Sequence, residues 1–399
     1  MVTNFSRMPL RICSTASPIT SPRRESSDWA LPTSSKSIIV CSALADGRDG
    51  LRCEAKVKVV SDWPTLLCDN RRSGGQLPQP WRAPRKSLWQ ASVEGSVRSA
   101  PILYDGLLYV SSLAGFLNAL DTRTGKVRWR FKTTAPIHST PSLNSGQVLV
   151  SCDGGTLYAI DSSSGTKTWD VPAGGEVWTS AIVSKDTIFF GDTNGNMQAV
   201  SSTNGTLQWK RALGGKIYST ACIAGQRVFV GSSDGRVYSM DAKSGDILWK
   251  TPTGDGIDSS PAVAKETLFV GSLDYFFYAI DTVNGAIRWQ HGAELGITSS
   301  PAISGDLVVF GCKAGVLRAL NVQTGKVIWA QRLGQAITAP PVISGGTVWI
   351  QSGMTYALNL ADGNILWRAS LGNSLQSAPV VTEAAVYLTG IEGNVYALA

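Results

Sequence analysis

One column of varied side chains recurs through this sequence at a spacing of forty residues, with a last step of thirty-eight, and it is where chemistry could occur. Each member stands directly before a short segment of the Ser-Thr-Pro type. The first five members combine aromatic rings with a guanidinium and a carboxylate, which is the composition of a ligand or peptide site. The column reads Arg98, His138, Trp178, Tyr218, Asp258, Thr298, Thr338 and Gln376.

The positions on either side of this column hold Ser or Thr, or Ile, Val and Leu, almost without change. Variation is therefore concentrated in the column, and Trp, Tyr and Arg are the residue types that dominate binding hot spots. The alternative is that an exposed column drifts freely and has no ligand. A tight turn later in each repeat is expected to open on the same face, where it adds Asp153, Asn194, Asp234, Tyr275, Lys313 and Glu392.

The residue types that several common reactions need are missing. The chain has two histidines, His138 and His291, so neither a zinc site nor a Ser-His-Asp triad follows. It has no P-loop and no GxGxxG between a strand and a helix. The column has no cluster of carboxylates to hold Ca²⁺, which takes about six to eight oxygen ligands. We therefore expect no catalytic residues, no metal and no cofactor.

Tryptophan marks the elements that must position this column. Its spacing is forty residues until the last step, which is thirty-eight because GCKAGVLRAL (311–320) is replaced by the shorter QSGMTYAL (351–358). A repeat of this length indicates a solenoid, a propeller or an array. The series is Trp89, Trp129, Trp169, Trp209, Trp249, Trp289, Trp329 and Trp367.

Each period has the pattern of four short antiparallel strands. Residues 259–262 begin a first strand, and the β-branched and aromatic residues 267–271 form a second. The equivalent of Asp234-Gly235 is a hairpin turn, the alternating residues 236–241 form a third strand, and a fourth strand ends at Trp249. Four such strands per repeat describe one blade of a β-propeller.

The phase of the repeat predicts the number of blades and how the ring closes. Eight strands end in Trp, and eight triplets of inner and middle strands begin near residues 99, 139, 179, 219, 259, 299, 339 and 377. The first element is a single strand with Trp89, and the chain ends at Ala399 after a third strand. We therefore predict an all-β, eight-bladed propeller of four-stranded antiparallel blades over residues 87–399. The Trp89 strand joins triplet 377–398 and closes the ring.

Three segments make the repeat specific: ALDTRTGKVRW (119–129), AIDSSSGTKTW (159–169) and AIDTVNGAIRW (279–289). They resemble the pyrroloquinoline-quinone (PQQ) repeat, the tryptophan-docking motif of eight-bladed propellers. Asp62-Trp63-Pro64, followed by Arg71-Arg72-Ser73-Gly74, is similar to the lead-in before such propellers, so the resemblance covers residues 62–399. The motif Asp is replaced at Ser201, Asn321 and Asn359, where weaker capping of the turn is expected.

The resemblance implies a structural role for the tryptophans. In the family, each Trp packs between blades over the turn glycine of the next repeat, and its indole N–H needs a backbone acceptor. Positive φ is expected at these glycines, which are Gly125, Gly165, Gly205, Gly245, Gly285, Gly325 and Gly363.

The resemblance also implies two functions. The chain is more similar to the non-enzymatic propellers of outer-membrane assembly than to quinoprotein dehydrogenases, because it lacks the adjacent Cys-Cys pair and the blade insertions of the enzymes. The first expectation is a non-catalytic, monomeric scaffold that binds a protein or peptide partner at the channel mouth. The alternative is a dehydrogenase-like propeller that binds PQQ or another small ligand.

Charge and cysteine content exclude further classes. The net charge of +7 lies mainly in the first 85 residues, where 13 Lys and Arg oppose 7 Asp and Glu, whereas residues 86–399 hold 23 and 22. The repeat region is therefore nearly neutral, and no nucleic-acid partner is expected. The seven cysteines are odd in number and form no CxxC pair, so a disulfide framework is not expected. No run of apolar residues is long enough for a transmembrane helix.

The first 60 residues form a leader of distinct composition. Residues 1–45 hold ten Ser and four Thr, with five basic residues against Glu25 and Asp28. This composition predicts an organellar transit peptide, and Val40-Cys41-Ser42-Ala43 resembles a plastid processing site. The alternatives are a secreted or periplasmic protein, since residues 43–45 offer an A-x-A cleavage site, and an unstructured extension. Residues 61–86 are expected to be a lead-in that packs on the propeller.

Overall fold

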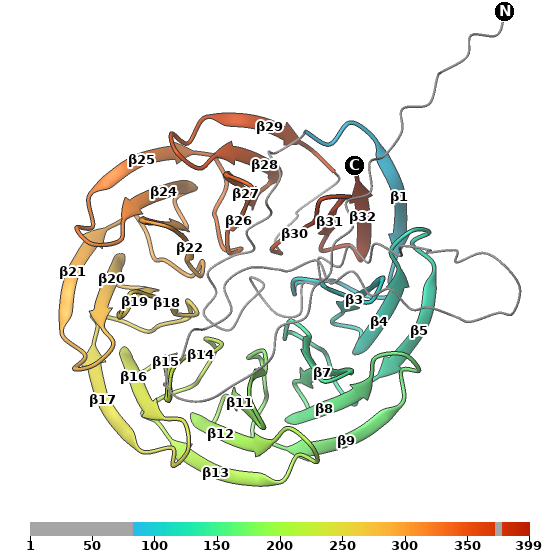
Figure 1. Ribbon diagram of the computed structural model, residues 1–399, viewed down its shortest axis with the longest axis horizontal. Helices are drawn as coiled ribbons and strands as arrows, with labels where there is room; N and C mark the ends of the chain where they lie inside the picture. Colours follow the sequence, from blue (N-terminus) through green and yellow to red (C-terminus); the bar gives the residue numbers. More distant parts are fainter. Residues whose placement is uncertain (1–82, 372–376) are drawn as a thin grey trace, which may run out of the picture. The chain divides into compact units, whose positions relative to one another are not determined.

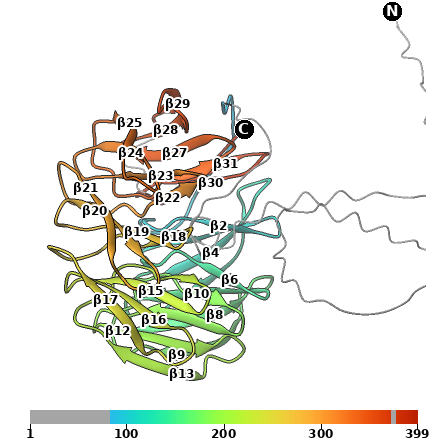
Figure 2. The same cartoon turned by 60° about the vertical axis from the view of Figure 1, so that its left-hand side comes forward.

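The computed structural model describes residues 83–371 and 377–399, and every regular element in this part is a β-strand. The strands form eight four-stranded antiparallel sheets arranged around one axis (Figure 1). Figure 2 shows the same sheets in a turned view, following one another around this unit. The predicted all-β, eight-bladed propeller is confirmed. The leader, most of the predicted lead-in and Gln376 lie outside the described residues, and among the described residues no helix could cross a membrane.

The first four blades run in sequence order from the inner to the outer strand. They are β2 (Ile102–Tyr104), β3 (Leu107–Ser111), β4 (Phe116–Asp121) and β5 (Val127–Lys132); β6 (Ser142–Asn144), β7 (Gln147–Cys152), β8 (Thr156–Asp161) and β9 (Lys167–Pro172); β10 (Ile182–Ser184), β11 (Thr187–Gly191), β12 (Asn196–Ser201) and β13 (Leu207–Ala212); and β14 (Cys222–Ala224), β15 (Arg227–Ser232), β16 (Arg236–Asp241) and β17 (Ile247–Pro252).

The next three blades follow the same order, and the last one combines both ends of the propeller. They are β18 (Ala262–Ala264), β19 (Thr267–Gly271), β20 (Phe276–Asp281) and β21 (Ile287–Gly292); β22 (Ala302–Ser304), β23 (Leu307–Gly311), β24 (Val316–Asn321) and β25 (Val327–Arg332); β26 (Val342–Ser344), β27 (Thr347–Ser352), β28 (Met354–Asn359) and β29 (Ile365–Ala369); and β30 (Val380–Val381), β31 (Val386–Thr389) and β32 (Asn394–Leu398) with β1 (Ser87–Ser92).

The prediction for the inner strands was wrong at their start. The Ser-Thr-Pro-type segments, expected to begin these strands, precede them, so that β2 starts at Ile102 and not near residue 99. The reason is hydrogen bonding from blade to blade. The N–H of Thr140 donates to the hydroxyl of Ser180 at 3.0 Å, and the N–H of Ser180 donates to the hydroxyl of Thr220 at 3.0 Å.

This interblade chain of bonds continues from the Thr220 N–H to Ser260 and from the Ser260 N–H to Ser300, over 2.9 and 3.0 Å. It does not pass Pro340, which stands where five other blades have Ser or Thr and the remaining two have Ala100 and Ala378. The chain fixes the backbone two residues after His138, Trp178, Tyr218 and Asp258.

The core lies between blades, because each blade buries both faces of its middle strands. The residues of β3 and β4 are almost all buried, whereas the outer strand β5 alternates between exposed and half-buried positions. One core cluster combines Tyr109 of one blade with Val148 and Ile160 of the next. Alternation of exposed and less exposed residues is therefore seen only in the outer strands, because the middle strands are buried on both faces.

The tryptophans dock neighbouring blades, as predicted. A Cβ added at Gly125 would lie 2.6 Å from the Trp89 ring, and the same close approach recurs at Gly165, Gly205, Gly245, Gly285, Gly325 and Gly363. All seven glycines have positive φ. Only a residue without a side chain leaves room for the indole of the neighbouring blade.

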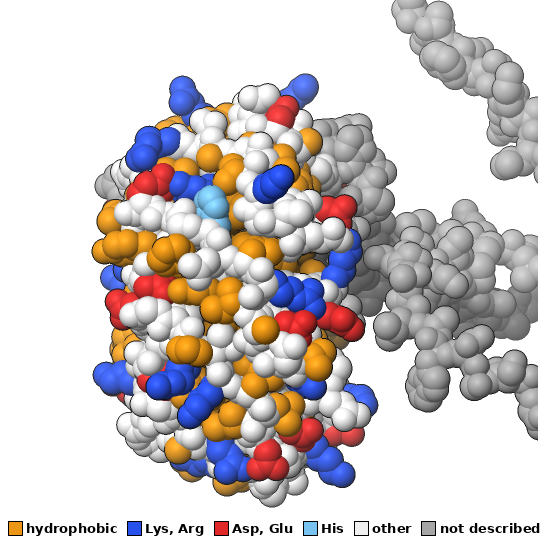
Figure 3. Space-filling view, turned by 90° about the vertical axis from the view of Figure 1, so that its left-hand side faces the viewer, with side chains coloured by type: hydrophobic (Ala, Val, Ile, Leu, Met, Phe, Trp, Pro, Cys, Tyr) orange, Lys and Arg blue, Asp and Glu red, His pale blue; other side chains and the backbone are white. Residues whose placement is uncertain are grey.

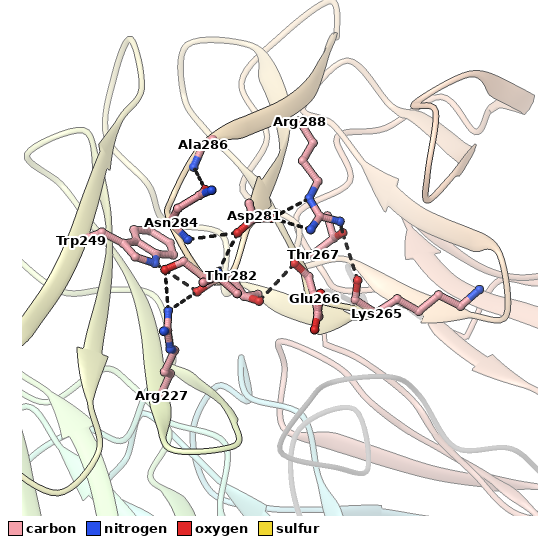
Figure 4. A network of polar contacts seen from close by, with 11 residues as sticks. Arg227, Trp249, Lys265, Glu266, Thr267, Asp281, Thr282, Asn284, Ala286 and Arg288 are labelled. Atoms are coloured by element: carbon pink, nitrogen blue, oxygen red, sulfur yellow. Dashed lines mark hydrogen bonds and ion pairs between the residues drawn. The ribbon is translucent and has the colours of Figure 1, made fainter.

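Figure 4 shows one of these junctions in detail. The indole Nε1 of Trp249 donates to the carbonyl of Thr282 at 3.1 Å, and Arg227 Nη1 donates to the same carbonyl at 2.6 Å. Asp281 holds this turn, since its carboxylate accepts from the backbone N–H of Asn284 and from the guanidinium of Arg288. These bonds lower the pKa of Asp281, with the Arg288 hydrogen bond as the main cause.

The expected weakening at the three turns without the motif Asp is confirmed in part. Asn321 Oδ1 accepts from two backbone N–H groups and from the Thr324 hydroxyl, as Asp121 does. Asn359 and Ser201 each accept one backbone N–H, from Ala361 and Thr203. An amide oxygen replaces the carboxylate in all of these bonds at Asn321, whereas the Asn359 amide and the shorter Ser201 hydroxyl each hold a single backbone bond.

The ends of the propeller close the ring, as the phase of the repeat predicted. β1 pairs with β32 from Ser87 opposite Leu398 to Ser92 opposite Asn394. The backbone N–H groups of Arg85 and Lys86 both donate to the carbonyl of Ala399. The Trp89 indole donates to the carbonyl of Thr122 at 2.8 Å and so docks this blade against the first one.

Candidate functional site

One face of the propeller carries both the column and the second set of turn residues. We call it the mouth face, and it consists of the segments that lead to the inner strands and the turns between the second and third strands. The two sets lie together because the N–H of Asp153 donates to the carbonyl of Pro136 at 2.9 Å, and the N–H of Lys313 donates to the carbonyl of Gly296 at 3.1 Å. The predicted common face is confirmed.

The column side chains point outward because their neighbours point inward. Val177 and Ile217, directly before Trp178 and Tyr218, are fully buried. Thr179 and Ser219, directly after these two residues, are buried as well, and their hydroxyls donate to the carbonyls of Gly191 and Gly231 in their own blades. In an extended segment the side chains alternate, so the residue between two buried ones is the one that faces solvent.

Three members of the column form one aromatic stack. The rings of His138 and Trp178 are stacked with centroids 4.5 Å apart, and the rings of Trp178 and Tyr218 are tilted with centroids 5.2 Å apart. Trp178 is 37% exposed, although it stands between two other rings. A large ring that is exposed and yet held by its neighbours is a preorganised contact surface.

Carboxylates border the stack at its His138 end. Asp153 Oδ2 lies 3.5 Å from Nε2 of His138. Burial raises the pKa of Asp153, His138 opposes this shift, and the nearby Glu176 carboxylate adds to it. The other oxygen of Asp153, Oδ1, is buried and has no hydrogen-bond partner among the described residues.

Asp258 has a different surrounding from the aromatic stack. Burial raises the pKa of this carboxyl, whereas the charge of Lys313 in the next blade lowers it. Asp255 adds a second negative charge nearby. The charges of Asp258 and Lys313, both predicted site residues, thus influence each other across a blade boundary.

The structure does not join the rest of the column to the stack. Arg98 is exposed, and within the described part of the chain no ring contact or ion pair ties it to the three rings. Thr338 is exposed, whereas the hydroxyl of Thr298 is buried without a partner among the described residues. The predicted arc of five is therefore observed as a stack of three.

Tyr275 stands out within the turns for a reason that the sequence pattern did not reveal. It has φ of 74°, in the left-handed region, where six other turns at this position have a glycine with φ between 72° and 83°: Gly115, Gly155, Gly195, Gly235, Gly315 and Gly393. Its side chain is 49% exposed, next to Phe276 at 37%. A bulky residue at positive φ is strained, and such strain is concentrated at functional sites. Comparing the repeats at this one turn position would have detected it.

The described segments and turns of the mouth face are acidic. Basic residues are few, namely Arg98, Lys216 and Lys313. Several of the acids are already paired, such as Asp234 with Arg236 and Glu294 with Arg318. The acids are Glu94, Asp153, Glu176, Asp192, Asp234, Asp255, Asp258, Asp274, Glu294 and Glu392.

The described residues of this face hold no cluster of metal ligands. Among the described residues no three His, Cys, Asp or Glu side chains converge to hold a metal ion. PQQ is a polyanion, and the excess of carboxylates on the mouth face would repel it. Cys152, Cys222 and Cys312 are all buried, and none adjoins a second cysteine in the sequence.

The rim of the propeller is a second surface with exposed apolar residues. The outer strands expose Ile247, Leu248, Ile287, Val327 and Ile328. Figure 3 shows that on this side the apolar side chains are scattered among Lys, Arg, Asp and Glu. Single apolar residues in such a mixture are usual on protein surfaces. The mouth face remains the better candidate because its aromatic rings are in contact with one another.

The sequence matches one family model over nearly the whole propeller. The model is described as outer membrane protein assembly factor BamB, and it matches residues 81–222 and 211–399. A comparison with curated protein sequences finds no match.

Solved structures share the fold at low sequence identity. BamB from Moraxella catarrhalis is 18% identical, with a TM-score of 0.69 over 78% of this chain and 99% of that one. The quinohemoprotein alcohol dehydrogenase from Comamonas testosteroni is 15% identical, with a TM-score of 0.72 over 84% of this chain and 80% of that one. A computationally designed protein, Ika8, is 18% identical, with a TM-score of 0.71 over 79% of this chain and 99% of that one. At these identities the similarity shows the fold alone.

Proposed function

The chain belongs to the family of the outer membrane protein assembly factor BamB, and on this premise we propose that it is a non-catalytic scaffold that binds a protein or peptide partner through its mouth face. The observation that carries the proposal is the stack of His138, Trp178 and Tyr218. It is an exposed aromatic surface held rigid by its own ring contacts. Rigid aromatic side chains lose little conformational entropy when a partner binds, so they contribute strongly to affinity.

The second candidate is a dehydrogenase-like propeller that binds PQQ or another small ligand. It is favoured by the structural similarity to a quinohemoprotein alcohol dehydrogenase, whose name states that activity. The acidic mouth face and the absence of a converging metal-ligand group among the described residues support the scaffold instead.

Adding PQQ with Ca²⁺ and measuring thermal unfolding tests the second candidate. A ligand at a hundred times its Kd adds about 2.7 kcal/mol of stability. We expect no shift of the melting temperature, and a shift that saturates with PQQ would support the dehydrogenase-like alternative.

Paired capture experiments test the scaffold. The full chain and a Trp178→Ala, Tyr218→Ala double variant serve as baits, and Thr338→Ala on the same face is the control. Each substitution in the stack should reduce affinity for a captured partner by about 2 kcal/mol or more. Stability should change little, because Trp178 is exposed and outside the blade-docking contacts. Partners bound equally by all the baits would contradict the proposal.

The compartment is a separate part of the proposal. The Ser- and Arg-rich composition of residues 1–60 supports a plastid transit peptide. A fusion of these residues to a fluorescent reporter should enter plastids and be shortened between about residues 40 and 60. Secretion of the reporter would favour the secretory alternative, and retention in the cytosol would contradict both.

A further inference from the structure

The charge around the aromatic stack is uneven. Glu176 and Trp178 flank the buried Val177, so both side chains lie on the outward side of the same extended segment. Asp153 approaches from the next turn and contacts His138, whose ring lies on Trp178. Two carboxylates therefore border the His138 end of the stack. At the other end, Lys216 flanks the buried Ile217 beside Tyr218.

We propose that the partner of the mouth face presents a lysine or arginine side chain, which lies on the part of the Trp178 ring that His138 and Tyr218 leave exposed, near the carboxylates of Asp153 and Glu176. This inference rests on the proposed function and adds the chemistry of the partner. A cation over the face of an indole is attracted by the ring quadrupole, and Trp is the strongest of the aromatic residues in this respect. Carboxylates next to the ring add a hydrogen-bonded ion pair.

The unpaired carboxylate oxygen supports a cationic occupant. Asp153 Oδ1 is buried and has no partner among the described residues. A buried carboxylate oxygen without a partner costs free energy, and a cation bound close to Asp153 would offset part of this cost through its charge. Lys and Arg carry several N–H donors and no acceptor, so they match carboxylate oxygens, which only accept.

The charge of the surrounding face favours a basic partner over an acidic one. Acidic residues outnumber basic ones on the described part of the mouth face, and the carboxylate of Asp153 contacts His138 of the stack. An acidic peptide or a nucleic acid would be repelled by this charge. A bare metal ion lacks a converging set of ligands among the described residues. A basic segment of a protein satisfies both the ring and the carboxylates.

A selection from short random peptides displayed on phage tests the inference with the full chain as target. Peptides that also bind the Trp178→Ala variant are removed. The remaining peptides should be enriched in Lys and Arg relative to the library. In synthetic versions, replacing the enriched Lys or Arg by Gln should weaken binding about tenfold. Raising the salt concentration should weaken binding of the original peptide more than that of its Gln version.

Matched variants of the protein locate the charge effect. Glu176→Gln and Asp153→Asn keep the shape of the side chain and should each weaken binding of the selected peptides several-fold. Glu392→Gln removes one negative charge from a distant turn of the same face and should leave binding unchanged. Unchanged melting temperatures in all three variants show that folding is not the cause.

The other possible results distinguish a failure of this inference from a failure of the proposed function. Peptides that depend on Trp178 but lack Lys and Arg would overturn the inference and leave the proposed function standing. An equal loss in Glu392→Gln would overturn the local site in favour of the general field of the face. No peptide that depends on Trp178 would overturn both this inference and the proposed function.

Discussion

Tyr275 combines backbone strain with exposure. Its φ of 74° suits glycine, and its side chain is half exposed on the mouth face. A Cβ at the equivalent Gly155 would lie 2.8 Å from the carbonyl oxygen of Gly175, which shows how little room this turn leaves. A strained residue persists when something other than stability maintains it. We interpret Tyr275 as a contact residue for the partner.

Replacing Tyr275 by glycine should therefore separate stability from binding. Tyr275→Gly is expected to raise the free energy of unfolding by about 1 kcal/mol, because glycine adopts positive φ without strain. The same variant should bind partner peptides more weakly. Denaturant unfolding and a binding titration measure the two effects. Gly235→Ala is the reverse control and should destabilise. A Tyr275→Gly variant that is less stable than the original chain would show that this side chain contributes to packing.

Asp121 illustrates how single carboxylates hold the outer turns. Its pKa is lowered to about 2, mainly by the hydrogen bond from Arg128 and also by that from Thr124. A carboxyl with a lowered pKa stabilises the folded state above its unfolded pKa of about 4. This stabilisation is lost as the pH falls through the folded value of about 2.

Asp121→Asn should therefore have an effect that depends on pH. Asn321 shows that an amide keeps the backbone bonds of this turn. At neutral pH the variant should lose up to about 1 kcal/mol of stability, because the charge interaction with Arg128 is gone. The difference from the original chain should shrink as the pH is lowered from about 4 towards 2. Urea unfolding at several pH values measures it, and a difference independent of pH would exclude the charge as the cause.

At the scale of the elements, the tryptophan contacts between blades are not all equal. The Trp209 indole donates to the carbonyl of Ala242 at 3.0 Å. Trp169 packs on Gly205 in the same way, but its Nε1 has no partner among the described residues. The equivalent acceptor, the carbonyl of Ser202, accepts from Asn144 Nδ2 at 2.9 Å instead.

These two tryptophans form a matched pair for mutation. Trp209→Phe should cost about 1 kcal/mol more than Trp169→Phe, because only the former leaves a carbonyl without its donor. Trp→Ala at either position should cost on the order of 3–5 kcal/mol, since it removes the ring between two blades. Chemical unfolding of the four variants measures these differences. Equal costs of the two Phe variants would mean that ring packing alone holds the junctions.

At the scale of the whole molecule, β1 is the element that closes the propeller. It pairs along the edge of β32, with one irregularity in register between Ser87 and Trp89, and Trp89 docks this blade on the first one. Without β1, the edge of β32 and the glycine turn at Gly125 would both lose their partners. An unpaired edge strand readily pairs with another chain.

A truncated chain that begins at Val93 should therefore associate and melt at a lower temperature. A chain that begins at Ala83 keeps β1 and serves as the control. A synthetic peptide of residues 83–92 should restore part of the stability of the shorter chain. Light scattering and thermal unfolding distinguish the species. A chain lacking β1 that stays monomeric and melts normally would contradict closure by this strand.

The sequence by itself determined the architecture. Because the repeat has a constant length, equivalent residues take equivalent places in every blade. Trp129, Gly165 and their equivalents therefore predict the same docking geometry at every junction between blades. The phase of the repeat then predicted the eight blades and the role of the Trp89 strand. These features follow from the order of residues along the chain, because neighbouring blades are neighbours in sequence.

Only the tertiary structure decided which side chains of the column contact one another. The spacing of the column puts Arg98, His138 and Trp178 at equivalent positions of successive blades. In the structure, a ring contact joins His138 to Trp178, whereas Arg98 has no contact with these rings among the described residues. The left-handed backbone of Tyr275 and the unpaired oxygen of Asp153 were likewise not evident from the repeat. Contacts of this kind depend on how each side chain turns towards residues of a neighbouring blade. The periodic pattern sets which residues share a face, and the packing of that face sets which of them meet.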